Sequence, residues 1–134
     1  MKNVLPNEWY ASWPATSLQA GAIAVKMYGW YHVYHPKWSS LNAAVKDTDV
    51  DQTFTVNTEV SSCTAAINAV GGVGVELNNG SLFETQYIAG STDSGGQYGG
   101  KMWQNGTNYW AGQGKGYTFM CHYYSCLLYT SRCV

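Results

Sequence analysis

The stretch PATSLQAGAIAVKMYGWYHVY, residues 14–34, decides the fold of this chain. Pro14 suits the start of a helix, because its fixed φ is helical and the first turn does not use its missing N–H. Good helix formers follow from Ala15 to about Tyr34, and Pro36 ends the pattern. Because apolar residues occur on nearly every face, we predict a long, buried helix.

Two further helices and a hairpin follow from the rest of the pattern. Residues 59–70 are Ala-rich and end at two glycines, and residues 108–120 predict a last short helix. Residues 73–77 and 81–87 flank Asn78-Asn79-Gly80, which is typical of a hairpin turn.

Two segments lack helical character. Residues 53–56 have the composition of a strand, which adds to the predicted hairpin. Residues 89–100 are polar and glycine-rich, and we expect either a binding loop or a flexible insertion there.

Composition bounds the class of protein. The chain has 134 residues, of which 46% are apolar, which is enough for one packed domain. Eight acidic and seven basic residues leave a net charge of −1 without a basic run, which argues against binding to nucleic acid. Aromatic residues, at 15%, outnumber charged ones, at 11%. Flat rings suit the apolar faces of sugars, although most rings in any domain belong to the core.

Glu8 stands in an unusually apolar setting, VLPNEW (4–9), with Trp13 shortly after it. Desolvation by large neighbours raises a carboxyl pKa toward the range in which the group donates a proton near neutrality. The alternative is a glutamate in an N-terminal loop facing water, and on these residues alone that alternative is the commoner one.

A series of short motifs extends the Glu8 segment over about residues 4–125. In order they are VLPNEW (4–9), SWP (12–14), LQA (18–20), AIAVK (22–26), YGWY (28–31), DQTF (51–54), LFETQY (82–87), AG (89–90), GKMWQNG (100–106), AGQGK (111–115) and YY (123–124). Together they resemble the SpoIID/LytB domain, the family of sporulation protein D and of amidase enhancers. Each motif is loose alone, but their order is specific.

The resemblance implies a fold and an activity. The fold is a single α+β domain with the long helix packed on a mostly antiparallel sheet. The activity is that of a lytic transglycosylase on peptide-free peptidoglycan strands, in which one glutamate acts first as acid and then as base. The muramic 6-hydroxyl closes the product as a 1,6-anhydro sugar, so one carboxylate suffices. Glu8 occupies the position of that glutamate.

Four further residues fall at positions that the family associates with its substrate. Lys26 stands where many members have arginine, and we assign it to substrate contact or to charge balance near Glu8. Gln52, Tyr87 and Gln104 are candidates to hydrogen-bond or stack on N-acetylated sugars. Judged alone, each of the three is more often a support of the fold, and Lys26 is as often a solvated lysine.

Metal and cofactor patterns are incomplete. Asp47, Asp49 and Asp51 alternate like calcium ligands, but Gln52 stands where the loop needs glycine. Some family members carry Cys/His zinc ligands in the segment 47–52, and none is present here. The glycines of residues 95–100 do not form a phosphate loop, because Met102 follows Lys101. We expect no metal and no cofactor.

The late motif, residues 97–104, departs from the family. It lacks the usual histidine and has Trp103 in the place of serine, so no role is assigned to those two positions.

Both ends of the chain look unnatural. Residues 126–134, CLLYTSRCV, match what translated sequencing-adapter DNA gives, so we expect the domain to span residues 1–125. The alternative is a real, frayed C-terminus. Met1 leads directly into the Glu8 motif, where family members have earlier strands and an export signal or anchor, so we expect an N-terminal truncation. Without that signal, an extracytoplasmic location, secreted or membrane-anchored, follows only from the resemblance.

Two other functions remain open. A non-catalytic module that binds peptidoglycan and stimulates a cell-wall amidase would use the same aromatic-rich cleft. A purely structural partner in a cell-wall complex would have no affinity for glycan. In either case a cell-wall amidase or another cell-wall hydrolase is the candidate partner.

Overall fold

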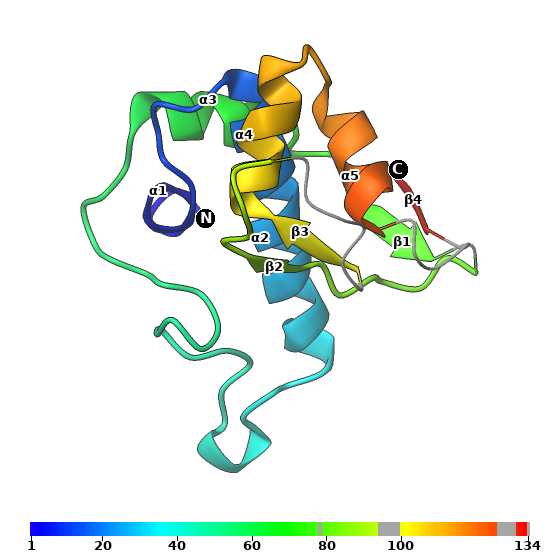
Figure 1. Cartoon of the computed structure of the whole chain (residues 1–134). Coiled ribbons are helices and arrows are strands. Elements are labelled where there is room, and N and C mark those ends of the chain that lie inside the picture. The colour runs from blue at the N-terminus through cyan, green and yellow to red at the C-terminus, as the bar shows by residue number, and fades with distance from the viewer. Residues whose placement is uncertain (78, 94–99, 126–130, 134) are drawn as a thin grey trace.

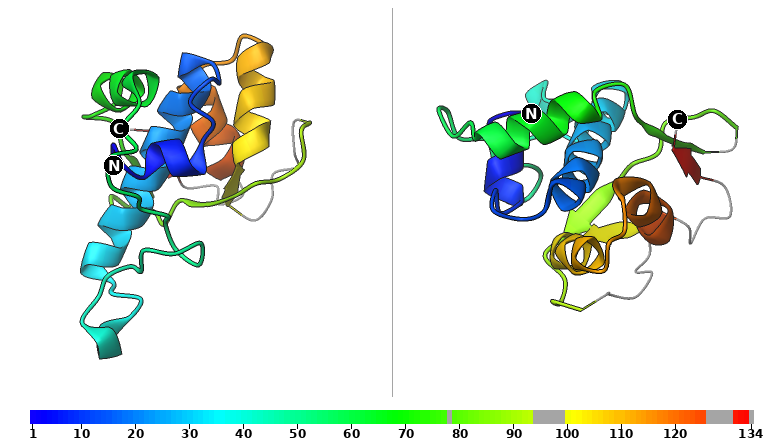
Figure 2. Two further views of the ribbon diagram at one scale, coloured as in Figure 1. Left: turned by 90° about the vertical axis from the view of Figure 1, so that its left-hand side faces the viewer. Right: turned by 90° about the horizontal axis from the view of Figure 1, so that it is seen from above.

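The long helix α2 (Ala15–Tyr34) lies at the centre of the fold, with the predicted bounds. The computed structural model describes residues 1–77, 79–93, 100–125 and 131–133. Four helices pack on α2: α1 (Leu5–Glu8), α3 (Ser61–Ala69), α4 (Gln104–Gly112) and α5 (Tyr117–Ser125). Figures 1 and 2 show α1 and α3 on one side of α2, and α4 and α5 on the other.

The predicted burial of α2 is confirmed for most of its length and fails near its end. Residues 20–25 are buried on every face, as the continuous apolar run predicts. Trp30, Val33 and Tyr34, in contrast, are exposed. Within the described ranges, no helix has the length and hydropathy needed to cross a bilayer.

The strands form two separate pairs. β1 (Val75–Leu77) pairs antiparallel with β4 (Ser131–Cys133), and β2 (Gln86–Ile88) pairs in parallel with β3 (Lys101–Trp103). The α+β class is therefore confirmed, but the described residues form two small two-stranded sheets instead of the expected mostly antiparallel one. The connection from β2 to β3 spans about a dozen residues, which suffices for a crossover between parallel strands. β4 lies in the segment expected to be an adapter-derived tail.

The predicted hairpin is confirmed only around its turn. Leu77 and Gly80 close the turn with a 2.8 Å backbone hydrogen bond, and Gly80 adopts a φ of 82° that favours glycine. Glu76 pairs with Leu82 across it, but this bridge is isolated. The second arm becomes a strand only at Gln86 and Tyr87, which belong to β2 and pair with β3 instead. Asn78 lies outside the described residues, as does half of the 89–100 loop, residues 94–99.

The strand predicted at residues 53–56 is wrong. The backbone amide of Thr53 donates to the Glu8 carboxylate, that of Phe54 to the Asp47 carboxylate, and that of Thr55 to the Asn3 carbonyl. Because side chains and the α1 segment take these donors, no strand ladder forms. The extended segment instead runs along α1, which brings it against Glu8.

The other helix predictions differ in extent. The helix predicted at 59–70 is confirmed as α3. The single helix predicted at 108–120 is wrong, because α4 ends at Gly112 and α5 begins at Tyr117. Gly114 has a φ of 73°, which an α-helix does not accommodate, so the chain turns between them.

Trp9 anchors α1 to the rest of the molecule. Its side chain is fully buried, and its indole N–H donates to the Thr107 hydroxyl of α4 at 3.0 Å. The ring packs on Gly21 of α2 and meets the Tyr87 ring of β2 edge-on at 5.1 Å. Three elements therefore fix the position of the residue that follows Glu8.

The Trp9–Gly21 contact predicts a large effect of a small substitution. In Gly21→Ala, the added Cβ would lie 2.5 Å from the Trp9 ring, which is well inside van der Waals contact. We expect a loss of about 1–3 kcal/mol in the free energy of unfolding, measured by denaturant titration. In the matched variant Gly29→Ala, on the same helix, the Cβ would lie 3.5 Å from the nearest atom. That variant should be neutral or more stable by up to about 1 kcal/mol, and equal losses in both would contradict this packing.

Candidate functional site

Glu8 is the last residue of α1 and lies at the meeting point of three segments. Pro6 favours the short helix, and the chain turns to extended geometry at Trp9, whose ring is buried. Residues 51–55 run beside α1, and Gln104 opens α4 directly opposite. The carboxylate is half-buried between them.

The two oxygens of Glu8 have different surroundings. Oε1 accepts a 2.7 Å hydrogen bond from the Thr53 amide, whereas the contact of Oε2 with the Gln104 amide nitrogen is longer, at 3.4 Å. The same nitrogen donates to the Glu8 carbonyl at 2.7 Å, which fixes the Gln104 side chain. Oε2 is therefore the oxygen better placed to hold a proton.

Burial raises the pKa of Glu8 above its ordinary value of 4.5, although the hydrogen bonds from Thr53 and Gln104 lower it in part. The predicted direction is therefore found in the structure. A raised pKa increases the protonated fraction near neutral pH, which a general acid requires.

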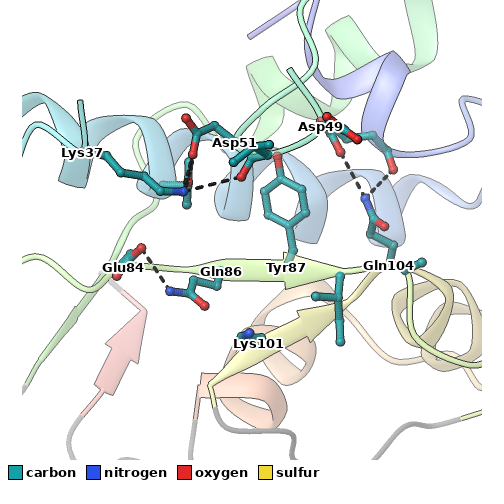
Figure 3. A pocket seen from close by; sticks show the side chains of 13 residues that line it. Lys37, Asp49, Asp51, Glu84, Gln86, Tyr87, Lys101 and Gln104 are labelled. Atoms are coloured by element: carbon teal, nitrogen blue, oxygen red, sulfur yellow. Dashed lines mark hydrogen bonds and ion pairs between the residues drawn. The ribbon is translucent and has the colours of Figure 1, made fainter. Parts of the chain in front are cut away.

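Two cavities meet at Glu8. The first, of about 490 Å³, is lined by four acidic residues, Glu8, Asp49, Asp51 and Glu84, and by Lys37 and Lys101, and we call it the charged cavity. Figure 3 shows it from close by, with β2 and β3 below.

The second cavity, of about 260 Å³, we call the aromatic cavity, because Trp9, Tyr10 and Trp13 line it. The two cavities share Glu8, Ala89 and Gln104. A ligand that occupies both would therefore pass directly over the Glu8 carboxylate.

Asp51 organises one wall of the charged cavity. Its carboxylate has no exposed surface and accepts hydrogen bonds from the Tyr28 hydroxyl at 2.8 Å, the Trp38 indole at 2.6 Å and the Lys46 amide at 2.8 Å. Lys37 completes the set with an ion pair. Burial alone would raise the Asp51 pKa, but these four donors hold it well below its usual range. Asp51 therefore stays ionised and acts as a fixed support.

Tyr87 projects from β2 into the charged cavity (Figure 3). Its hydroxyl oxygen is buried and makes no well-formed hydrogen bond within the described part of the chain, although the Gln52 side chain lies near enough to favour ionisation slightly. Burial, followed by the Glu8 charge, raises the Tyr87 pKa far above its ordinary value, so the hydroxyl stays protonated. Buried polar groups normally have partners, so this hydroxyl is a candidate to bond a ligand once the side chains that cover it move aside.

The structure brings three of the five predicted site residues together. Glu8, Tyr87 and Gln104 line the charged cavity. Lys26 lines neither cavity at Glu8. Its ammonium group donates instead to the carbonyls of Val70, Gly71 and Val73, which directly follow α3 in the chain.

Gln52 lies outside both cavities as well. It is buried and donates to the Val25 carbonyl at 2.9 Å. Gln52 holds its segment to α2, which is the support role that the sequence left open for it. Lys26 also holds a neighbouring segment to α2, a role that differs from both the predicted substrate contact and the solvated alternative.

Sequence reasoning missed the Tyr28–Lys37–Asp51 group. The signal was the alternation of Asp47, Asp49 and Asp51, which suggested only calcium. Within the described ranges, no three His, Cys, Asp or Glu side chains gather in a way that would hold a metal ion. Asp51 is instead neutralised by Lys37, and Asp47 caps the Phe54 amide at the other end of the segment.

Cys63 and Cys121 are buried. Neither lines the cavities at Glu8. They have no part in the chemistry considered below.

Comparison of the chain with protein-family models, with curated proteins and with solved structures finds no match.

Proposed function

We propose that this chain cleaves peptide-free peptidoglycan strands by the lytic transglycosylase reaction, with Glu8 as general acid and then general base. The observation that carries the proposal is the half-buried Glu8 carboxylate at the junction of two cavities, with a raised pKa. The likeness to the SpoIID/LytB motifs supports it. Action on peptidoglycan would place the chain outside the cytoplasmic membrane.

The proposed reaction assigns each proton to a named atom. Glu8 Oε2 protonates the departing glycosidic oxygen while positive charge develops on the sugar. The resulting carboxylate then takes the proton of the muramic 6-hydroxyl, which attacks the anomeric carbon and forms the 1,6-anhydro ring. Glu8 ends protonated, so the cycle closes without a second carboxylate or a cofactor.

The neighbouring groups suit supporting roles. The Thr53 amide holds Oε1, which leaves Oε2 toward the substrate, and the Gln104 amide keeps the carboxylate in position. When the side chains that cover it move aside, the protonated Tyr87 hydroxyl can donate to a sugar oxygen or an N-acetyl carbonyl. Asp51 is already satisfied by four donors, so it is poorly suited to be a nucleophile.

A cleavage assay tests the proposal. Peptide-free glycan strands incubated with the chain should give shorter, soluble fragments, seen by liquid chromatography. Intact strands together with measurable binding would replace the proposal with a glycan-binding enhancer of a cell-wall amidase. Intact strands without binding would favour a structural partner.

The pH dependence provides a further prediction. Because the acid must be protonated, kcat/KM should fall as the pH rises through the raised Glu8 pKa. Gln104→Met removes a donor that favours the ionised form, so the midpoint of this fall should move to higher pH. Measurement of kcat/KM against pH separates this shift from weaker binding, which lowers the whole curve. A shift to lower pH would contradict the role of Gln104.

A further inference from the structure

Four cavities follow one another along the molecule, and neighbouring cavities share residues. Beyond the charged cavity lies an intermediate one of about 330 Å³, which shares Glu84 and Gln86 with it. A fourth, distal cavity of about 680 Å³ shares Tyr31, Leu77 and Leu82 with the intermediate one. The shared lining residues place the four cavities in a series that runs from Trp13, past Glu8, to the end of α2.

The distal cavity has an aromatic floor supplied by the last turns of α2. Trp30 and Tyr34 are one turn apart and therefore share a face of the helix, with 47% and 65% of their surfaces exposed. Tyr31 and His35 lie beside them, with their rings stacked at 4.3 Å. Leu77 and Leu82 line the cavity as well.

The chemistry of the groove changes along its length. The charged cavity has carboxylates and ammonium groups on its walls, whereas the distal cavity is mostly apolar with tyrosine, histidine and serine polar groups among the rings. Sugar rings have apolar C–H faces and a rim of hydroxyl groups, so they suit a floor of exposed rings with such polar atoms.

We propose that the distal cavity is a remote sugar-binding subsite for the same glycan strand, an inference that rests on the proposed function. A polymer that crosses Glu8 has further units on each side, and the shared lining residues give one direction in which those units can continue. Binding at the Trp30–Tyr34 platform then favours long strands over short ones, because only long strands reach it.

The test compares strands of two lengths in the Glu8→Gln background, which prevents turnover during the binding measurement. Affinity is measured by isothermal calorimetry for peptide-free strands of two disaccharide units and of eight or more. Trp30→Ala and Tyr34→Ala are the test variants, and both side chains are exposed enough to be removed without opening the core. Phe54→Ala is the matched control, because Phe54 is 43% exposed and lies outside all four cavities.

We expect each test variant to bind long strands about tenfold more weakly and short strands as the parent does, with no effect of Phe54→Ala. Equal losses for both lengths, or no loss, would overturn the subsite. The subsite would also be overturned if analytical ultracentrifugation showed that the parent chain is a dimer and that these variants dissociate it without any change in glycan affinity. If the chain cleaves no glycan but the parent still binds long strands more tightly than short ones, the subsite is supported and only the proposed cleavage is refuted. If the parent binds no glycan at all, both the subsite and the proposed cleavage are refuted.

Discussion

Glu8→Gln is expected to lower the rate of glycan-strand cleavage by about 10²- to 10⁴-fold while leaving binding almost unchanged. Glutamine has nearly the same shape as glutamate and keeps an oxygen that can accept the hydrogen bond from the Thr53 amide. It cannot, however, act as an acid and protonate the leaving oxygen. The rate is measured from soluble fragments, and binding from calorimetry at a pH where the wild-type chain is slow.

The control for that experiment is Glu59→Gln. Glu59 is exposed, its contact with Lys2 is a loose 3.9 Å, and it lies outside the cavities at Glu8. Its removal should leave both rate and affinity unchanged. If Glu8→Gln retained full activity, the acid would have to be another carboxylate of the charged cavity, and Glu84→Gln and Asp49→Asn would identify it.

Asp51→Asn is expected to lower the free energy of unfolding by about 2–4 kcal/mol at neutral pH. The asparagine amide group would face donors that now bond a carboxylate, since Tyr28, Trp38, Lys46 and Lys37 all donate to Asp51. This loss is at the lower end of the range for breaking a buried ion pair, because the Lys37 side chain is 37% exposed and its ammonium group can be solvated by water in the variant.

The loss should depend on pH in a defined direction. The folded state holds the Asp51 pKa below its ordinary value of 3.8, so the carboxylate contributes its full stability above that value and loses it as the pH falls further. Denaturant titrations at pH 7 and near pH 3 should therefore show a smaller difference between wild type and variant at the acidic pH. Asp49→Asn, at an exposed neighbouring residue, should change stability by less than about 0.5 kcal/mol at both. A difference that grew on acidification would contradict the assigned network.

The central helix could be predicted from sequence because its signals are local. Pro14 and Pro36 bracket it, and good helix formers fill the space between them. The exposure of Trp30 and Tyr34 could not be predicted in this way, because apolar character on every face does not show where the neighbouring elements end.

The strand errors have a common physical cause. Residues 53–56 carry β-branched and aromatic side chains, but the amides of residues 53–55 donate to Glu8, Asp47 and Asn3, of which Glu8 and Asn3 are distant in sequence. The parallel pairing of β2 with β3 likewise depends on the path of the intervening chain and not on the composition of either strand.

The candidate site was predictable only in part. The apolar neighbours of Glu8 indicated a raised pKa, and motif order indicated Tyr87 and Gln104, all of which line one cavity. Lys26 and Gln52 also matched motif positions, but the position of a residue in a motif does not reveal whether its side chain points toward the cavities at Glu8 or toward another part of the fold. The Asp51 network needed the fold, because its donors come from three separate places in the chain: Tyr28, the adjacent pair Lys37 and Trp38, and Lys46.

Mass spectrometry of peptide-free glycan strands after incubation with the wild-type chain and with Glu8→Gln tests the central claim most directly. If Glu8 transfers the proton and the muramic 6-hydroxyl closes the ring, the wild-type products end in 1,6-anhydromuramic acid and these products vanish in Glu8→Gln. Products with ordinary reducing ends would contradict the account, because they would show that water is the nucleophile, and anhydro products that persist in Glu8→Gln would contradict the assignment of Glu8.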